Sequence, residues 1–221
     1  MTYMNAVCPI SGQSGKEEIL NSVTHGIGVL LSIVGLVFVV VLSSIYGNVW
    51  HIVSCSVYGS TMVLLYSAST WYHGCRGGKL KGVLQVLDHI CISLFIAGSY
   101  TPFALVSLHG TWGWSLFGVI WGMALVELVL ELFFAGKSDL LSTIIYLAMG
   151  WVSVIAIVPL VKSLSLGGSV LFISGGIAYS LGTIFYLWEK LPFNHSIWHL
   201  FVLAGSICHY CTILFYVVPM K

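Results

Sequence analysis

Long apolar runs follow one another along the chain, with only short polar breaks between them. They cover about residues 22–42, 49–72, 86–106, 113–134, 140–161, 168–188 and 195–217. Within each run the hydrophobic residues are continuous and do not alternate with polar ones, which favours helices over the strands of a membrane barrel. Because a helix needs about 20 apolar residues to cross a bilayer, each run predicts one membrane span. The pattern therefore predicts an all-α polytopic membrane protein, a bundle of seven transmembrane helices.

The composition agrees with this fold class. Of the 221 residues, 58% are hydrophobic and only 7% are charged, and the mean hydropathy is +1.01. Soluble domains carry roughly 25% charged residues. The net charge of +1 gives no basis for a nucleic-acid partner. We divide the chain into a cytoplasmic N-terminal tail, residues 1–21, and a seven-span domain, residues 22–221.

The tail is polar and carries three charged residues just before the first run, Lys16, Glu17 and Glu18. Charged residues at this position are typical of an interfacial turn. We therefore expect the tail to take no part in catalysis.

Positive charge is distributed unevenly between the two predicted sides of the membrane. One side carries Lys16, Arg76, Lys79, Lys81, Lys137 and Lys190. The other side carries Lys162 and Lys221. Because cytoplasmic loops carry the excess of Lys and Arg, this bias predicts a cytoplasmic N-terminus and an external C-terminus.

Few ionisable side chains lie within the apolar runs, and several of them occur at span ends. His73 ends the second span, Asp88 opens the third, and His195 and His199 open the seventh. In the predicted topology these ends all lie on the cytoplasmic side. Since an ionisable group in hydrocarbon costs several kcal/mol, each is a candidate functional residue.

The spacing of the histidines suggests a metal site. His195 and His199 are four residues apart, so they project from one face of a helix and are able to bind one ion together. A third imidazole from His73 would leave a fourth position open, which is the pattern of a catalytic zinc. No Glu stands beside His195, so Asp88 is the candidate general base. Two other interpretations stay open: the histidines are interfacial or hydrogen-bonded residues, and Asp88 caps its helix.

Two more histidines have alternative interpretations. His25 is placed to line the same cavity, or to pack beside Gly26 and Gly28. His209 follows His199 by ten residues, roughly 15 Å along a helix, too far to bind the same ion. It is a candidate for proton relay or substrate contact, or a hydrogen-bonded core histidine.

The fourth span contains Glu127 and Glu131. We expect Glu131, close to Lys137, to be interfacial, and the sequence assigns no role to Glu127. Their spacing of four residues also suggests a metal or a proton path.

Helix geometry singles out two further features. Pro102 is expected to bend the third span and to expose carbonyls to a cavity lined by the polar residues 99–101, although it is equally an ordinary tolerated proline. Gly118 and Gly122 form a pair of small residues that permits close helix contact, within the chain or in a homodimer.

Several motifs together resemble the hemolysin III family of bacterial membrane proteins, relatives of the progestin and adipoQ receptors. The similarity is carried by NSVTHGIG, ASTWYHG, LDHICISLFIAGSYTPF, YLAMGWVS, YSLGTIFY and NHSIWHLFVLAGSICH. It implies a seven-helix bundle in a bacterial inner membrane with a cytoplasmic N-terminus. It also implies zinc bound by His73, His195 and His199, with Asp88 holding the water on the zinc and Ser69 one turn before the first ligand.

The resemblance suggests a function as well. The receptor relatives are linked to ceramide hydrolysis, which implies a zinc-dependent hydrolase of lipid amides with a membrane lipid as substrate. The alternative is a non-enzymatic lipid or stress sensor, or a cytolytic pore, in which zinc only joins the helices. A third interpretation, a proton or ion transporter using Glu127 and His209, requires that these two side chains face each other.

Overall fold

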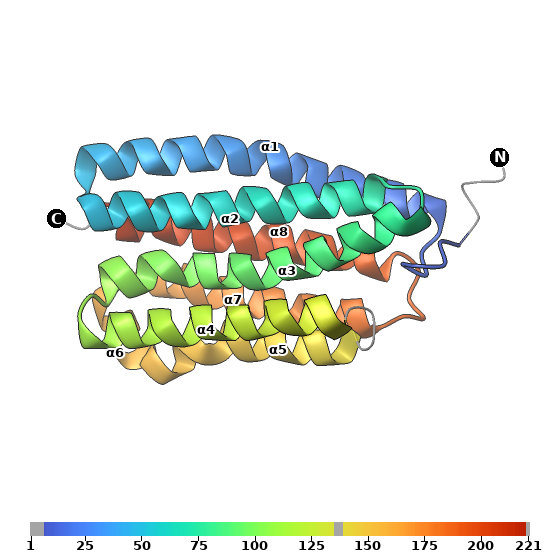
Figure 1. The fold of residues 1–221 in the computed structure, drawn as a ribbon. Helices are drawn as coiled ribbons and strands as arrows, with labels where there is room; N and C mark the ends of the chain where they lie inside the picture. The colour runs from blue at the N-terminus through green and yellow to red at the C-terminus, as the bar shows by residue number, and fades with distance from the viewer. Residues whose placement is uncertain (1–6, 135–138, 220–221) are drawn as a thin grey trace.

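The computed structural model describes residues 7–134 and 139–219, and nearly all of them are helical (Figure 1). The helical elements are α1 (Gly15–Tyr46), α2 (Val49–Gly74), α3 (Gly78–Pro102), η2 (Phe103–Ser107), α4 (Thr111–Phe134), α5 (Asp139–Trp151), η3 (Val152–Ala156), α6 (Ile157–Ser163), α7 (Leu166–Leu187), α8 (Asn194–Thr212) and η4 (Ile213–Val217). Within the described residues, seven helical segments are long and apolar enough to cross a membrane. The predicted all-α bundle of seven spans is therefore confirmed.

Three of the seven spans combine more than one helical element. The third runs from Gly78 to Ser107 through α3 and η2, the fifth from Leu140 to Ser163 through α5, η3 and α6, and the seventh from Asn194 to Val217 through α8 and η4. The third changes from α-helical to π-helical geometry directly after Pro102. A π-helical turn there is consistent with the expected disturbance, because proline cannot donate the regular backbone hydrogen bond.

The first helix begins earlier than the apolar run does. Its N-cap is Ser14, whose hydroxyl accepts from the backbone N–H of Glu17, while the Glu17 carboxylate accepts from the backbone N–H of Ser14. This capping box satisfies two backbone groups that a helix start leaves open. Part of the predicted tail thus belongs to α1, whose first turn carries Glu17 and Glu18.

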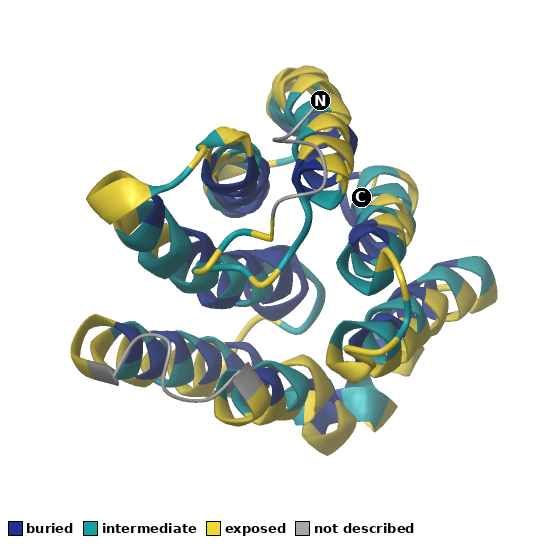
Figure 2. Cartoon of the chain, turned by 90° about the vertical axis from the view of Figure 1, so that its right-hand side faces the viewer, coloured by how far each residue is buried: buried dark blue, intermediate teal, exposed yellow. Residues whose placement is uncertain are grey.

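The face that α1 turns inward is made of polar and small residues. Its buried positions are Gly15, Glu18, Asn21, Thr24, His25, Gly28, Ser32, Gly35, Val39 and Ser43. Large apolar side chains such as Leu30, Val34 and Phe38 are exposed. Lipid tails solvate such side chains, whereas small residues let helices approach closely, so this pattern suits a membrane solvent. Figure 2 shows buried segments turned toward the middle of the bundle and exposed ones turned outward.

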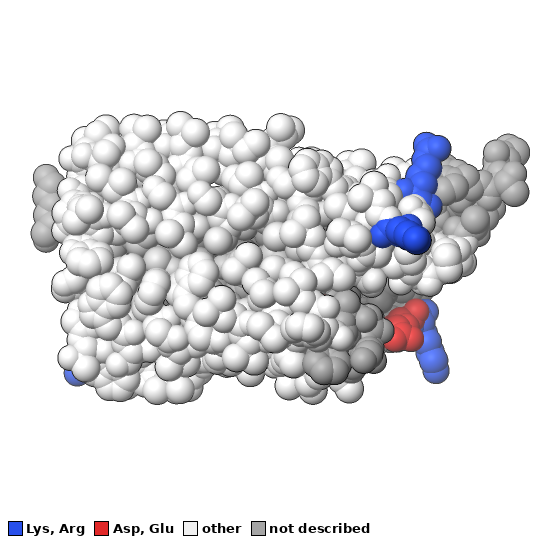
Figure 3. Space-filling view, in the orientation of Figure 1, with Lys and Arg blue, Asp and Glu red and all other residues white. Residues whose placement is uncertain are grey.

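Most charged side chains visible in Figure 3 lie at the right-hand end of the bundle, a basic side chain also shows at the left-hand end, and the middle of this face carries none. We call the right-hand end, where α1 and α8 begin and α2 ends, the N-terminal end (Figure 1). Lys137 and Lys221, which contribute to the predicted orientation, lie outside the described residues. The cytoplasmic placement of the N-terminus stays a prediction.

The polar residues 99–101 do not all line a cavity. Ser99 and Tyr100 do, whereas the buried Thr101 hydroxyl donates to the carbonyl of Ala97 at 2.9 Å and accepts from Trp121 Nε1 at 3.2 Å. Thr101 therefore joins α3 to α4.

Gly118 and Gly122 form no close helix contact within the described chain. A Cβ atom built at either position meets no atom within 4 Å among the described residues. The face is left to lipid or to a second copy.

Candidate metal centre

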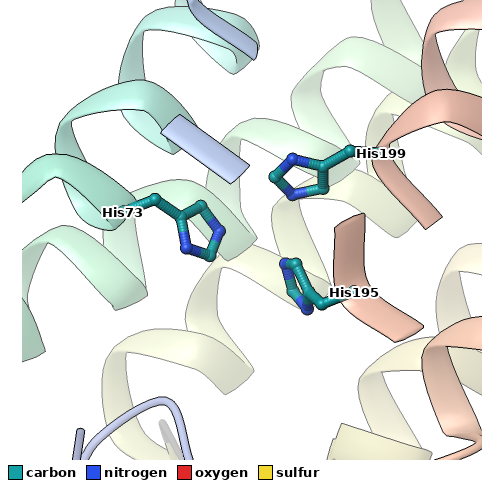
Figure 4. A group of neighbouring side chains, drawn as sticks. All are labelled: His73, His195 and His199. Carbon is teal, nitrogen blue, oxygen red and sulfur yellow. The ribbon is translucent and has the colours of Figure 1, made fainter. Parts of the chain in front are cut away.

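Three histidines from two distant stretches of chain meet at the N-terminal end. His73 comes from the last turn of α2, and His195 and His199 come from the first two turns of α8. One ligand nitrogen from each lies within 4.8 Å of the others. Figure 4 shows the three rings turned toward a common point. The predicted convergence of His73, His195 and His199 is present in the structure.

The cluster is compact and largely shielded from solvent. Ring centroids lie 4.9 Å apart for His73 and His195, 5.0 Å for His73 and His199, and 4.7 Å for His195 and His199. His73 and His199 are buried, and His195 is partly exposed. The helical spacing of four residues explains why both α8 rings point to the same side.

One ring nitrogen of His73, Nδ1, contacts a buried carboxylate. His73 Nδ1 lies 2.8 Å from Glu18 Oε2, and Glu18 is itself buried. The opposite nitrogen, His73 Nε2, is buried without a hydrogen-bond partner among the described residues. A buried, unpartnered imidazole nitrogen next to two other imidazoles fits the position of a metal ligand.

A buried lysine completes the surroundings of Glu18. Lys81 Nζ lies 2.7 Å from Glu18 Oε1 and donates to the carbonyls of Tyr72 and Cys75 at the end of α2. Carbonyls at the C-terminal end of a helix lack their regular helical partners, so a cation beside them is favourable. Lys81 has no exposed surface, so its charge is neutralised inside the protein and is not presented to lipid headgroups.

The first helix also contacts His199. The Thr24 hydroxyl donates to the carbonyl of Asn21 at 2.9 Å and lies 3.2 Å from His199 Nδ1. The ring of His25 stacks on the ring of His199 at 3.5 Å and 7°. His25 lines the adjoining cavity, and its ring also packs edge-on against the ring of Tyr66, for which Gly28 makes room.

A cavity of about 690 Å³ opens beside the cluster. Its wall includes His195 and His199 together with Asp88 and Ser69, the two residues that the sequence analysis placed near the metal. Asp88 and Ser69 are buried, and the Ser69 hydroxyl interacts with the Asp88 carboxyl group. The structure thus places the candidate base and the candidate orienting hydroxyl on the same cavity as two of the histidines.

Away from the cluster, the cavity wall is largely apolar. It includes Phe95, Phe103, Phe172 and Val202, from α3, η2, α7 and α8. His209 lies on this part of the wall, where its Nε2 lies 3.1 Å from the carbonyl of Phe172. His209 is therefore a hydrogen-bonded interior histidine, one of the two interpretations of the sequence.

A second pair of histidine and carboxylate lies between α3, α4 and α5. His89 Nδ1 lies 2.6 Å from Glu131 Oε1, and the Ser142 hydroxyl donates to the same oxygen at 3.3 Å. Close by, the Tyr146 hydroxyl donates to Glu127 Oε1 at 2.9 Å. Glu131 is buried, because α4 turns this side chain toward His89. Its interfacial depth in the membrane stays a prediction.

Sequence reasoning missed two groups that contact the histidines. Glu18 was assigned to an interfacial turn, and Thr24 was not singled out. A signal was available: residues 18, 21, 25, 28 and 32 are polar or small and recur every three or four positions, whereas most of the positions between them are large and apolar. Such a stripe marks one face of a helix.

The donor set fits a divalent transition metal. Three neutral imidazoles suit zinc and several other first-row ions, and three protein ligands with an open position are typical of catalytic sites. The fold and this site define a class: a multi-pass α-helical membrane protein with a three-histidine centre that is able to hold a metal ion.

Comparison with known sequences specifies the family. The profile described as Haemolysin-III related matches residues 13–210, and the chain belongs to this family. It is similar to Hemolysin-3 homolog of Bacillus subtilis (strain 168), 50% identical over 205 residues that cover 93% of this chain and 96% of the relative. Hemolysin-3 of Bacillus cereus is 47% identical over 204 residues, covering 92% and 93% of the two chains. Monocyte to macrophage differentiation factor of Homo sapiens is 27% identical over 220 residues, covering 96% and 90%.

Proposed function

We propose that the protein is a zinc-dependent hydrolase of lipid amides, of the ceramidase type, in a bacterial inner membrane. The observation that carries the proposal is that two histidines of the three-histidine cluster line one cavity together with Asp88 and Ser69. A structural metal site does not require a carboxylate and a hydroxyl facing a cavity. A hydrolytic site requires both a proton acceptor and room for the substrate.

The residues that would hold the zinc are His73, His195 and His199. The chemistry that zinc supplies when bound is Lewis-acid polarisation of a carbonyl group and of water. An oxygen of the Asp88 carboxylate accepts the proton that the attacking water loses, and later returns it to the leaving amine. Ser69 holds this carboxylate in place through its hydroxyl.

The shape of the cavity supports a lipid as substrate. A volume of about 690 Å³ falls in the range of pockets that bind small molecules. Its polar end carries the histidines and Asp88, and its remaining wall contains aromatic and aliphatic side chains. An amide at the polar end with an alkyl chain along the apolar wall matches this division.

One experiment tests both the metal and the reaction. The purified full chain is assayed for metal content, and its products from ceramide are measured by mass spectrometry, in wild type and Asp88→Asn. We expect about one zinc per chain in both, and a fall in turnover of about 10²- to 10⁴-fold in the variant, since general base catalysis contributes that much. Full turnover in Asp88→Asn would rule out the proposed mechanism.

The competing function is a membrane sensor or pore in which the metal only joins helices. One observation favours it: the three histidines connect α2 with α8, which are far apart in the sequence. In that case chelation lowers thermal stability, and the intact protein turns over no lipid. The names of the two Bacillus relatives contain hemolysin. Conductance across liposomes that survives chelation would favour a pore. The transporter interpretation gains no support, because Glu127 bonds to Tyr146 in the second cluster whereas His209 bonds to Phe172.

A further inference from the structure

We infer that α1 supplies positioning residues for the metal centre: Glu18 and Thr24 fix the tautomers of His73 and His199, so that Nε2 of each ring faces the ion. This inference rests on the metal centre of the proposed function. It adds to that function a role for a helix from which no ligand comes.

The contact with Glu18 allows only one tautomer of the neutral His73 ring. Glu18 forms an ion pair with Lys81 at 2.7 Å, and an ionised carboxylate accepts hydrogen bonds but donates none. The hydrogen on His73 Nδ1 must therefore point to Glu18 Oε2, 2.8 Å away. The lone pair of the neutral ring then lies on Nε2, the atom that has no partner among the described residues.

Glu18 is itself held from several sides, which makes it suitable for positioning. Its carboxylate is bonded by the Ser11 hydroxyl as well as by His73 and Lys81. Lys81 is anchored in turn by the carbonyls of Tyr72 and Cys75. A carboxylate with this many partners cannot rotate away from His73 without breaking several bonds.

Thr24 plays the same part for His199. Its hydroxyl hydrogen is used by the carbonyl of Asn21, so the oxygen presents a lone pair to His199 Nδ1 at 3.2 Å. His199 Nδ1 is therefore the donor, and Nε2 keeps the lone pair. Asn21 ties this part of α1 to the first turn of α8, because the Ser196 hydroxyl donates to its side-chain oxygen at 2.5 Å.

The arrangement is one that metal sites use generally. A histidine ligand donates its other ring N–H to a carboxylate or another acceptor, which sets the tautomer and the ring orientation and makes the ligand nitrogen more basic. Loss of such a partner typically weakens metal affinity by about 10- to 100-fold. The second pair, Glu131 with His89, gives a matched control, because it has the same groups but no other histidine that would complete a site within the described residues.

The test measures zinc affinity on the purified full chain in detergent, by competition with a chromophoric chelator. We expect Glu18→Gln to weaken the affinity about 10- to 100-fold and Glu131→Gln to leave it within about twofold of wild type. The visible absorption of bound Co²⁺, which reports ligand geometry, should change in Glu18→Gln alone. Equal zinc affinity in wild type and Glu18→Gln would overturn the inference.

A second measurement needs no variant, in case Glu18→Gln fails to fold. The ¹⁵N chemical shifts of the His73 ring in metal-free wild type should show a protonated Nδ1 and an unprotonated Nε2, and the reverse would overturn the inference. A wild-type chain that binds no metal would end both the inference and the proposed function. A chain whose zinc affinity depends on Glu18 but that cleaves no lipid would leave the inference standing and remove the hydrolase.

Discussion

The protein contains two buried pairs of histidine and glutamate with almost the same local geometry and different surroundings. Glu18 and His73 are 2.8 Å apart, and Glu131 and His89 are 2.6 Å apart. Around the first pair stand Lys81 and two further imidazoles, and around the second stand hydroxyl groups and another carboxylate, Glu127. The contact between ring and carboxylate is therefore not what makes a metal site. A metal site needs, in addition, other ligand nitrogens that converge on the free side of the ring.

The difference has a structural cause. His73 lies in the last turn of α2, one turn after Ser69, and faces the start of α8, which offers two histidines at helical spacing. His89 lies on α3 and faces α4 and α5, which offer Glu131, Ser142 and Tyr146. We interpret the second cluster as a polar contact that holds α3, α4 and α5 together, since buried polar groups in a membrane need partners within the protein.

The largest predicted effect is on zinc content, when the histidine of either pair is replaced by alanine. His73→Ala should reduce the zinc content from about one per chain to nearly none, because two ligands on one helix cannot replace three. His89→Ala should leave the content unchanged. Elemental analysis of the purified proteins measures both. A full equivalent of zinc in His73→Ala, or its loss in His89→Ala, would show that the two pairs have been assigned the wrong way round.

Much of the fold and of the candidate site could be predicted from the sequence. The seven spans were predictable because the length of each apolar run reflects the thickness of the bilayer. His195 and His199 were predictable from their spacing, and His73 from its rarity inside an apolar run. The partnership of Glu131 with His89, 42 residues apart, was not, since one sequence gives no information on which faces of two helices meet.

Glu18 was missed for a different reason. A charged residue in a polar stretch before a span is ordinary, so only the stripe of polar and small residues that begins at position 18 distinguishes Glu18 from Glu17. Only the start of α1 at Gly15 turns Glu18 inward, and this start depends on the capping box of Ser14 and Glu17. A helix boundary that is misplaced by a few residues is enough to move a functional side chain from the core to the surface.

An intermediate effect is predicted for the second pair, and it concerns stability. Glu131→Ala removes the partner of His89 and of Ser142 in a buried position, which should cost about 1–3 kcal/mol. For a chain of this length, that corresponds to a fall in Tm of roughly 2 to 12 °C. Thermal unfolding in detergent measures the shift, with zinc content as the control that should not change. An unchanged Tm would mean that the second cluster does not hold its helices together.

The smallest predicted effect compares the hydroxyl groups beside the two pairs. Thr24→Val keeps the shape of the side chain but removes the oxygen that accepts from His199 Nδ1, which should weaken zinc affinity by about threefold to tenfold, since a neutral hydrogen bond contributes about 0.5–1.5 kcal/mol. Ser142→Ala removes the hydroxyl that bonds to Glu131 and should leave zinc affinity unchanged. Competition with a chromophoric chelator measures the zinc affinity of both variants. If both variants bound zinc as tightly as wild type, the contact of Thr24 with His199 would be packing only, and positioning by α1 would depend on Glu18 alone.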